Sequence, residues 1–208
     1  MYNDNNWQVV EGAETEPFLK SVNPIAGKHS AAPQSAKVEW RQLPFYKDIA
    51  MVRVSDRSWP PGTGPFWFLA KQGRMFHLDG SSTPIHEANE AGPIEVSEEN
   101  ALDYLRFFCY FVHGDDGPFL IVEDLNDNAF DAGKMDDAMK KVLEGSIRPA
   151  AFEGKNEKGE LQTSGMVLYG DALFAARFSM TENGLIEMVD DEPIAADLPV
   201  TGKRPAVA

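Results

Sequence analysis

Four polar side chains recur along an otherwise apolar segment, residues 97–114. Asp103, Arg106, Tyr110 and His113 are spaced three, four and three residues apart, so on a helix they lie on one face. A guanidinium can bind a carboxylate, a tyrosine supplies a hydroxyl, and a histidine titrates near neutral pH. This face is one predicted wall of a ligand-binding pocket. The alternative is a solvated stripe, in which an exposed Asp103–Arg106 ion pair contributes little to stability.

A second group of candidates lies in residues 80–89, GSSTPIHEAN. His86 could act as a general base toward a ligand bound at the first face. His86 and Glu87 are adjacent, and adjacent side chains of an extended segment point to opposite faces, so only one would face a given site. The spacing of His77, Asp79 and His86 matches no established zinc pattern, so we predict no metal. An ordinary loop rich in hydroxyls is the alternative.

The remaining polar motifs point to no catalytic machinery. The acidic run EDLNDNAFDAG, residues 123–133, has the alternating oxygens of a calcium loop but lacks its central glycine and its final glutamate. The sequence has no G-x-S-x-G, H-E-x-x-H, P-loop or dinucleotide-binding glycine pattern. We therefore assign no catalytic residue and predict no cofactor, and whether the chain is an enzyme stays undecided.

Tryptophans mark a different kind of candidate, a surface for a partner protein. Trp59 and Trp67 stand at the two ends of WPPGTGPFW, a loop stiffened by prolines, and Trp7 lies in the N-terminal segment. Large aromatic side chains are the usual anchors of protein interfaces. We assign Trp59, Trp67 and Trp7 as partner-binding residues. The alternative is that the tryptophans of the loop pack into the core.

Charge and cysteine content limit the classes of partner and compartment. The net charge of -14 disfavours nucleic acids and anionic membranes and favours a neutral or basic partner. Cys109 is the only cysteine, so an intrachain disulfide is excluded, and its apolar neighbours indicate a small buried hydrophobe. The N-terminus has neither the basic region nor the apolar run of a signal peptide. We expect a cytoplasmic protein.

The helices and strands that must position these residues are expected to form an α+β fold. Leu102 to Val112 is apolar on nearly every side of a helix, so this helix must be buried. Strands precede it, and a second, amphipathic helix is predicted over 133–144. Strong turn signals then separate a C-terminal four-stranded β-meander of antiparallel strands over 147–152, 161–169, 172–180 and 185–189.

Domain limits follow from composition. Residues 1–37 are small, polar and broken by proline, which predicts an extended N-terminal arm or linker. Its apolar residues could dock on the body of the same chain or on a neighbouring subunit. Residues 38–198 are predicted to form a single α+β domain, because the apolar helix needs cover from the β segments on both sides. Residues 199–208 are predicted to be a C-terminal tail.

Two functions are consistent with these observations. The first is a non-catalytic protein-binding or assembly protein, which uses aromatic anchors and an acidic surface to bind a protein partner or a second copy of itself. The second is a small-molecule-binding sensor or enzyme with a pocket lined by Arg106, Tyr110, His113 and His86. The second hypothesis predicts that His86 and His113 converge across a cleft.

Overall fold

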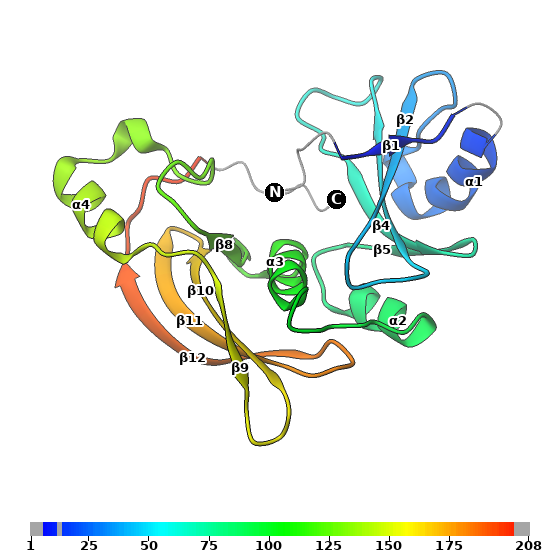
Figure 1. Cartoon of the computed structure of the whole chain (residues 1–208). Helices are drawn as coiled ribbons and strands as arrows, with labels where there is room; N and C mark the ends of the chain where they lie inside the picture. Colours follow the sequence, from blue (N-terminus) through cyan, green and yellow to red (C-terminus); the bar gives the residue numbers. More distant parts are fainter. Residues whose placement is uncertain (1–5, 12–13, 202–208) are drawn as a thin grey trace. The chain divides into compact units, whose positions relative to one another are not determined.

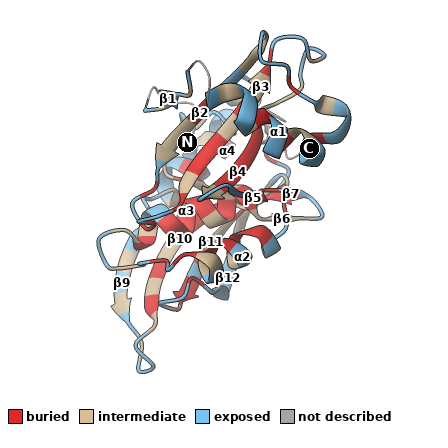
Figure 2. Ribbon diagram, turned by 90° about the vertical axis from the view of Figure 1, so that its right-hand side faces the viewer, coloured by how far each residue is buried: buried red, intermediate tan, exposed pale blue. Residues whose placement is uncertain are grey.

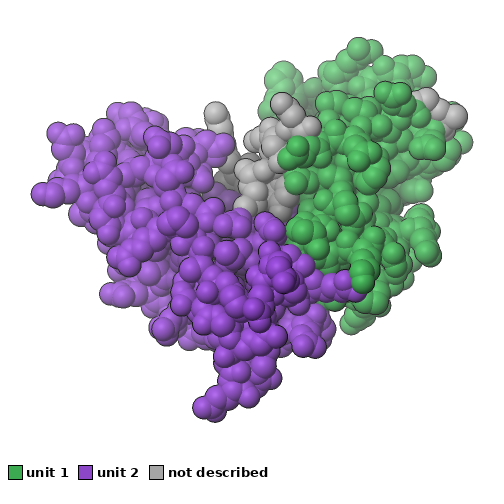
Figure 3. Space-filling view, viewed as in Figure 1, with its two compact units in different colours: residues 1–94, 206–208 green, residues 95–205 purple. Residues whose placement is uncertain are grey.

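The chain forms two compact units, which divide between Ile94 and Glu95 (Figure 3). The computed structural model describes residues 6–11 and 14–201 (Figure 1). Each unit has its own antiparallel sheet and its own helices, and each is described by itself. The domain limits predicted from the sequence stay a prediction, and residues 202–208 of the predicted tail lie outside the described residues.

Unit 1 is built on a five-stranded antiparallel sheet whose spatial order equals its sequence order. Gln72 and Gly73 both have positive φ, 46° and 83°, as in a two-residue hairpin turn. The strands are β1 (Gln8–Val9), β2 (Ala36–Gln42), β3 (Ala50–Asp56), β4 (Phe66–Lys71) and β5 (Arg74–His77).

Two helices of unit 1 differ from the sequence expectation. Residues 15–26, expected in an extended arm, form α1 (Thr15–Ala26), which is followed by the 3-10 turn η2 (Gly27–His29). Leu19, Val22 and Ala26 form a buried stripe that packs on the sheet. Pro24 suggested a break, and it lies in the last turn of α1, two residues before the helix ends at Ala26.

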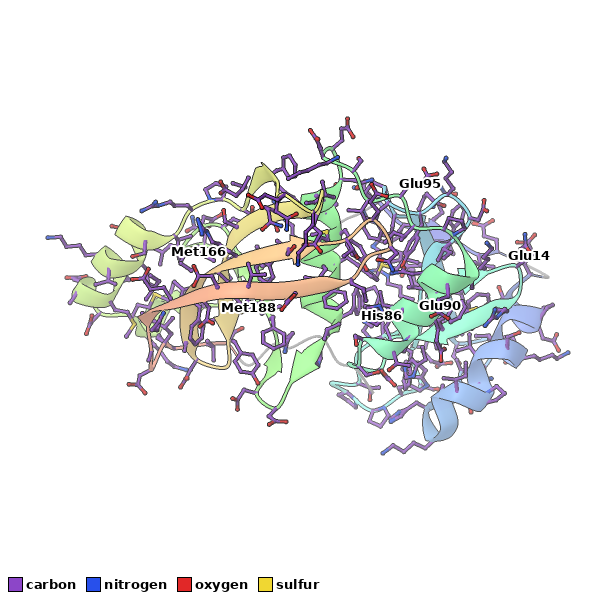
Figure 4. All side chains as sticks on the ribbon, turned by 90° about the horizontal axis from the view of Figure 1, so that it is seen from below. Glu14, His86, Glu90, Glu95, Met166 and Met188 are labelled. Atoms are coloured by element: carbon purple, nitrogen blue, oxygen red, sulfur yellow. The ribbon has the colours of Figure 1, made fainter. Side chains whose placement is uncertain are left out.

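The segment around His86 is also helical. It forms α2 (Thr83–Ala91), with Pro84 in the first turn, where proline needs no backbone donor. Ile85 and Ala88 are buried, whereas His86 of the same helix is partly exposed (Figure 4). His86 and Glu87 therefore do not alternate across an extended segment as the sequence suggested.

Unit 2 consists of a curved antiparallel sheet, two helices and a small hairpin (Figure 1). The sheet order is β12-β11-β10-β8, and β9 pairs with β10. The strands are β6 (His113–Gly114), β7 (Gly117–Pro118), β8 (Leu120–Val122), β9 (Ala151–Lys155), β10 (Leu161–Tyr169), β11 (Ala172–Met180) and β12 (Ile186–Ala195). The helices are α3 (Ala101–Phe111), α4 (Asp137–Ser146) and the 3-10 turn η3 (Ala132–Lys134).

These elements confirm the predicted α+β class. The apolar run forms α3, in which Tyr104, Leu105, Phe107 and Phe111 are fully buried, and Figure 2 shows buried residues concentrated along α3 and the inner strands. The amphipathic helix is α4, which begins at its capping residue Asp136 rather than at the predicted residue 133. The turns of the meander β9 to β12 are as predicted, but its first strand, predicted over 147–152, is Ala151–Lys155, because residues 147–150 connect α4 to the sheet.

The two faces of the unit 2 sheet are covered differently. Met166, Leu168 and Leu173 share one face and pack with Leu143 of α4 in one hydrophobic cluster. Val167 alternates to the other face. Helix α3 packs against β8, β9 and β10, and no residue of α3 belongs to the cluster under α4 among those described, so α3 covers the second face.

None of the helices in the described part of the chain is long and apolar enough to cross a membrane. The longest, α1, has 12 residues, and a membrane span needs about 20.

One carboxylate ties the connection between α1 and β2 to the end of β3. Asp56 accepts hydrogen bonds from the backbone N–H of Ala32 at 2.9 Å, the hydroxyl of Ser35 at 2.8 Å, and the N–H and hydroxyl of Ser58 at 2.8 and 2.7 Å. Burial alone would raise the pKa of this carboxyl, but the hydrogen bonds outweigh burial and lower the pKa to about 2.

We predict that Asp56→Asn destabilises unit 1 by about 1–3 kcal/mol at pH 7. A pKa lowered from 3.8 to about 2 stabilises the fold above pH 3.8 and loses that contribution as the pH falls toward 2, so the difference between variant and wild type should shrink in acid. Tryptophan fluorescence in urea measures this unit alone, because all four tryptophans (Trp7, Trp40, Trp59 and Trp67) lie in it. The exposed Asp48→Asn is the control, and an equal loss in both variants would contradict the prediction.

Candidate functional site

Arg106, the predicted anion-binding residue, is bonded to carboxylates of its own unit. Its Nη2 donates to Oε1 of Glu123 at 2.7 Å, and its Nη1 lies 3.8 Å from Asp103. The same oxygen of Glu123 accepts the backbone N–H of Ala150 at 3.0 Å. Burial would raise the pKa of Glu123, but Arg106 and this N–H lower it. The predicted Asp103–Arg106 contact thus exists, with Glu123 as the shorter partner.

The other predicted ligand-binding residues are distributed over both units. Tyr110 packs its ring against Phe111, with the ring centroids 4.9 Å apart, and burial raises the pKa of its hydroxyl. His113 lies in β6, opposite Pro118 of β7. His86 belongs to unit 1, whereas Arg106, Tyr110 and His113 belong to unit 2. The convergence of His86 with His113 stays a prediction.

The three tryptophans assigned to partner binding all contact other side chains of unit 1. Trp67 is 3% exposed and lies within β4. The Trp7 ring packs against it at a tilt of 57°, with the ring centroids 5.6 Å apart, and the guanidinium carbon of Arg53 lies 4.3 Å from the Trp7 ring centroid. Trp59 packs edge-on against Phe66 at 5.4 Å and is half-buried. Trp7 and Trp59 keep part of their surface in solvent, and Trp67 does not.

The structure adds a site that the sequence analysis did not find. A groove of about 700 Å³ crosses the face of the unit 2 sheet that α4 covers only in part. Met166, labelled in Figure 4, lies on its floor beside Ala175. One wall is β12 and the other is the connection from α4 to β9. The charged residues that line the groove, together with Ser164, are Arg148, Glu153, Arg177, Asp190 and Glu192.

Strand register places the lining side chains in two rows across the sheet. Ser164 of β10 is opposite Arg177 of β11, which is opposite Asp190 of β12, and this row is polar. Two residues along, Met166 is opposite Ala175 and Ala175 is opposite Glu192. The second row therefore offers an apolar floor that ends in a carboxylate at the edge of the sheet.

Few of the charges in the groove are neutralised inside the protein. Arg177 and Asp190 are 4.0 Å apart, and both side chains are 68% exposed, so their attraction is weak. Glu153 accepts a hydrogen bond from the hydroxyl of Ser164 at 2.6 Å. Within the described part of the chain, Arg148 and Glu192 make no ion pair. These two side chains stand on opposite walls of the groove.

The sequence contained a signal for this wall, but the strand was predicted to end too early. The strand predicted over 185–189 continues as β12 to Ala195 and includes Asp190, Asp191, Glu192 and Pro193. Acidic residues and proline argue against a central strand, but both are common in an edge strand, where one side of the backbone needs no partner. The rows across the groove depend on register between strands, which no local pattern of the sequence contains.

The groove is large enough for a ligand, and its lining offers charged and polar groups. Among residues 6–11 and 14–201, no three His, Cys, Asp or Glu side chains lie close enough to hold a metal ion. The groove offers carboxylates, guanidinium groups, a thioether and the hydroxyl of Ser164, which donates to Glu153 at 2.6 Å. Cys109 is buried in α3, and burial raises the pKa of its thiol to about 12.

We predict that Cys109 of the folded protein does not react with a disulfide reagent at pH 8. A thiol with a pKa near 12 has only about one part in ten thousand as thiolate at that pH, and the side chain is inaccessible. Absorbance after adding dithiobis(nitrobenzoic acid) should rise only when guanidinium chloride unfolds the chain. Rapid reaction without denaturant would show that α3 opens and that the thiol is available for chemistry.

Comparisons with known proteins do not indicate a function for this chain. No protein-family model, curated protein or solved structure matches this chain. The lining residues of the groove all come from unit 2, and they leave charged groups exposed to a ligand.

Proposed function

We propose that this chain is a non-catalytic binding protein, and that the groove of unit 2 binds a basic segment of a partner protein. The observation that carries the proposal is the open groove, about 700 Å³, with three carboxylates around an apolar floor. The carboxylates belong to Glu153, Asp190 and Glu192. The volume lies within the range of ligand sites, and the open form suits a chain segment that passes through it.

Charge supports a basic partner. The strand β12 carries four acidic side chains (Glu187, Asp190, Asp191 and Glu192) and no basic one, and all four are exposed. With a net charge of -14, the whole chain attracts cations over the Debye length, about 8 Å at physiological salt. Complementary charge speeds encounter and excludes acidic partners. The apolar floor at Met166 and Ala175 would then contribute burial.

A second copy of the chain is disfavoured as the occupant of this groove. Two copies that met through β12 would bring eight carboxylates together, which is unfavourable unless cations intervene. Assembly through another surface stays a separate proposal. So does the sensor or enzyme hypothesis for Arg106, Tyr110, His113 and His86, and the bonding of Arg106 to Glu123 weakens its anion-binding part.

We predict that neutralising the β12 wall weakens binding of a basic peptide. The probe is acetyl-Gly-Lys-Ser-Val-Ser-Lys-Gly-amide, titrated into the ¹⁵N-labelled full chain while amide chemical shifts are followed. The amides of Met166, Ala175 and Glu192 should shift. Asp190→Asn with Glu192→Gln should weaken the affinity by about two- to tenfold, because each exposed ion pair is worth about 0.2–1 kcal/mol.

The control removes the same charge elsewhere in unit 2. Glu157→Gln with Glu182→Gln changes two exposed carboxylates outside the groove. Glu157 lies in the turn between β9 and β10, and Glu182 lies in the turn between β11 and β12. Its affinity for the probe should equal that of the wild type. An equal loss in both variants would mean attraction to net charge without a site. Unchanged groove amides at millimolar peptide would overturn the proposed function.

A further inference from the structure

The groove has a cation opposite its acidic β12 wall. Glu153 of β9 lies on the same side as this cation and accepts a hydrogen bond from the hydroxyl of Ser164. Glu192 and Asp190 stand on the β12 wall, and Arg148 stands on the wall formed by the connection between α4 and β9. A ligand with positive charge alone would meet Arg148 as a repulsive group. The β12 wall can therefore attract a cation and Arg148 an anion, although the net charge of the chain is negative.

The cation on the second wall is not neutralised by the protein. Within the described residues, Arg148 makes no ion pair and no hydrogen bond through its side chain, and it is exposed. The other arginine of the groove, Arg177, has Asp190 at 4.0 Å. Glu123, which accepts the backbone N–H of Ala150 at the end of this connection, is also bonded to Arg106. Arg148 is thus available to an anionic group of a ligand.

We infer that the bound segment carries a basic side chain at position i, an apolar one at i+2 and an acidic one at i+4. This inference rests on the proposed function. Crossing from β9 to β12 takes three strand spacings of roughly 4.8 Å, or about 14 Å. An extended segment advances about 3.4 Å per residue, so four residues cover this distance.

The period of an extended chain places the side chains as the groove requires. Residues i, i+2 and i+4 of such a segment point to the same side. The basic residue then faces Glu192 and Asp190, the middle residue lies on Met166 and Ala175, and the acidic residue faces Arg148. The segment runs across the strands on the face of the sheet, and it adds no strand to the edge.

The test uses three peptides that differ at one position. Acetyl-Gly-Lys-Ser-Val-Ser-Glu-Gly-amide is compared with its Gln and Lys counterparts at the last charged position, titrated into the ¹⁵N-labelled full chain. The wild type should bind the Glu peptide about two- to fivefold more tightly than the Gln peptide, and the Lys peptide more weakly than both. Arg148→Gln should remove this order, and Arg148→Glu should reverse it.

The controls separate failure of the inference from failure of the proposed function. Lys141→Gln, on the exposed surface of α4 and outside the groove, should leave the preference for the Glu peptide intact. Equal binding of the three peptides at the groove amides would overturn the role of Arg148 and leave a basic-segment site. If none of the peptides shifts these amides, the proposed function and the inference both fail. Amide spectra of each variant without peptide establish that it is folded.

Discussion

The architecture of unit 2 depends on one strand, β10, to which three others are hydrogen-bonded. It pairs with β11 over its whole length, with β9 over its first residues and with β8 over its last ones. Because side chains alternate, β10 presents buried apolar residues to both faces, such as Met166 to one and Val167 to the other. Helix α3 covers one face, and its Tyr104 hydroxyl donates to the carbonyl oxygen of Gly184 at 2.7 Å, which fixes the helix to the turn before β12. The other face has only α4, a helix of ten residues.

The groove is a consequence of this unequal cover. Helix α4 closes the end of the sheet where Leu168 and Leu173 pack with Leu143, and it does not extend over the row of Ser164, Arg177 and Asp190. A sheet face that no helix covers must be polar to remain in water, and this row is polar. Met166 and Ala175 lie between the covered and the uncovered part. An apolar floor beside charged walls therefore arises where one helix ends.

Much of the fold could be predicted from the sequence, because its strongest signals are local. Turn residues such as Asn183-Gly184 mark the meander, and the apolar run marks α3. Helices α1 and α2 were missed because Pro24 and Pro84 suggest breaks. Pro84 stands in the first turn of α2, which tolerates proline, and Pro24 lies two residues before the end of α1. Of the candidate sites, the contact of Arg106 with Asp103 followed from helical spacing. The groove did not, because Ser164, Arg177 and Asp190 meet only through the register of two hairpins.

The acidic residues of β12 serve two physical requirements that are compatible. An edge strand of ten residues invites pairing with another copy, and like charges oppose that pairing. The register adds a second obstacle, because Val189 and Ile194 are extra residues that interrupt the pairing of β12 with β11 and bend the edge. Pro193 removes one backbone donor as well. The edge is thus a poor template for an added strand, while the carboxylates of Asp190 and Glu192 remain available at the groove. Charges that prevent self-association at the edge can therefore attract a partner to the face.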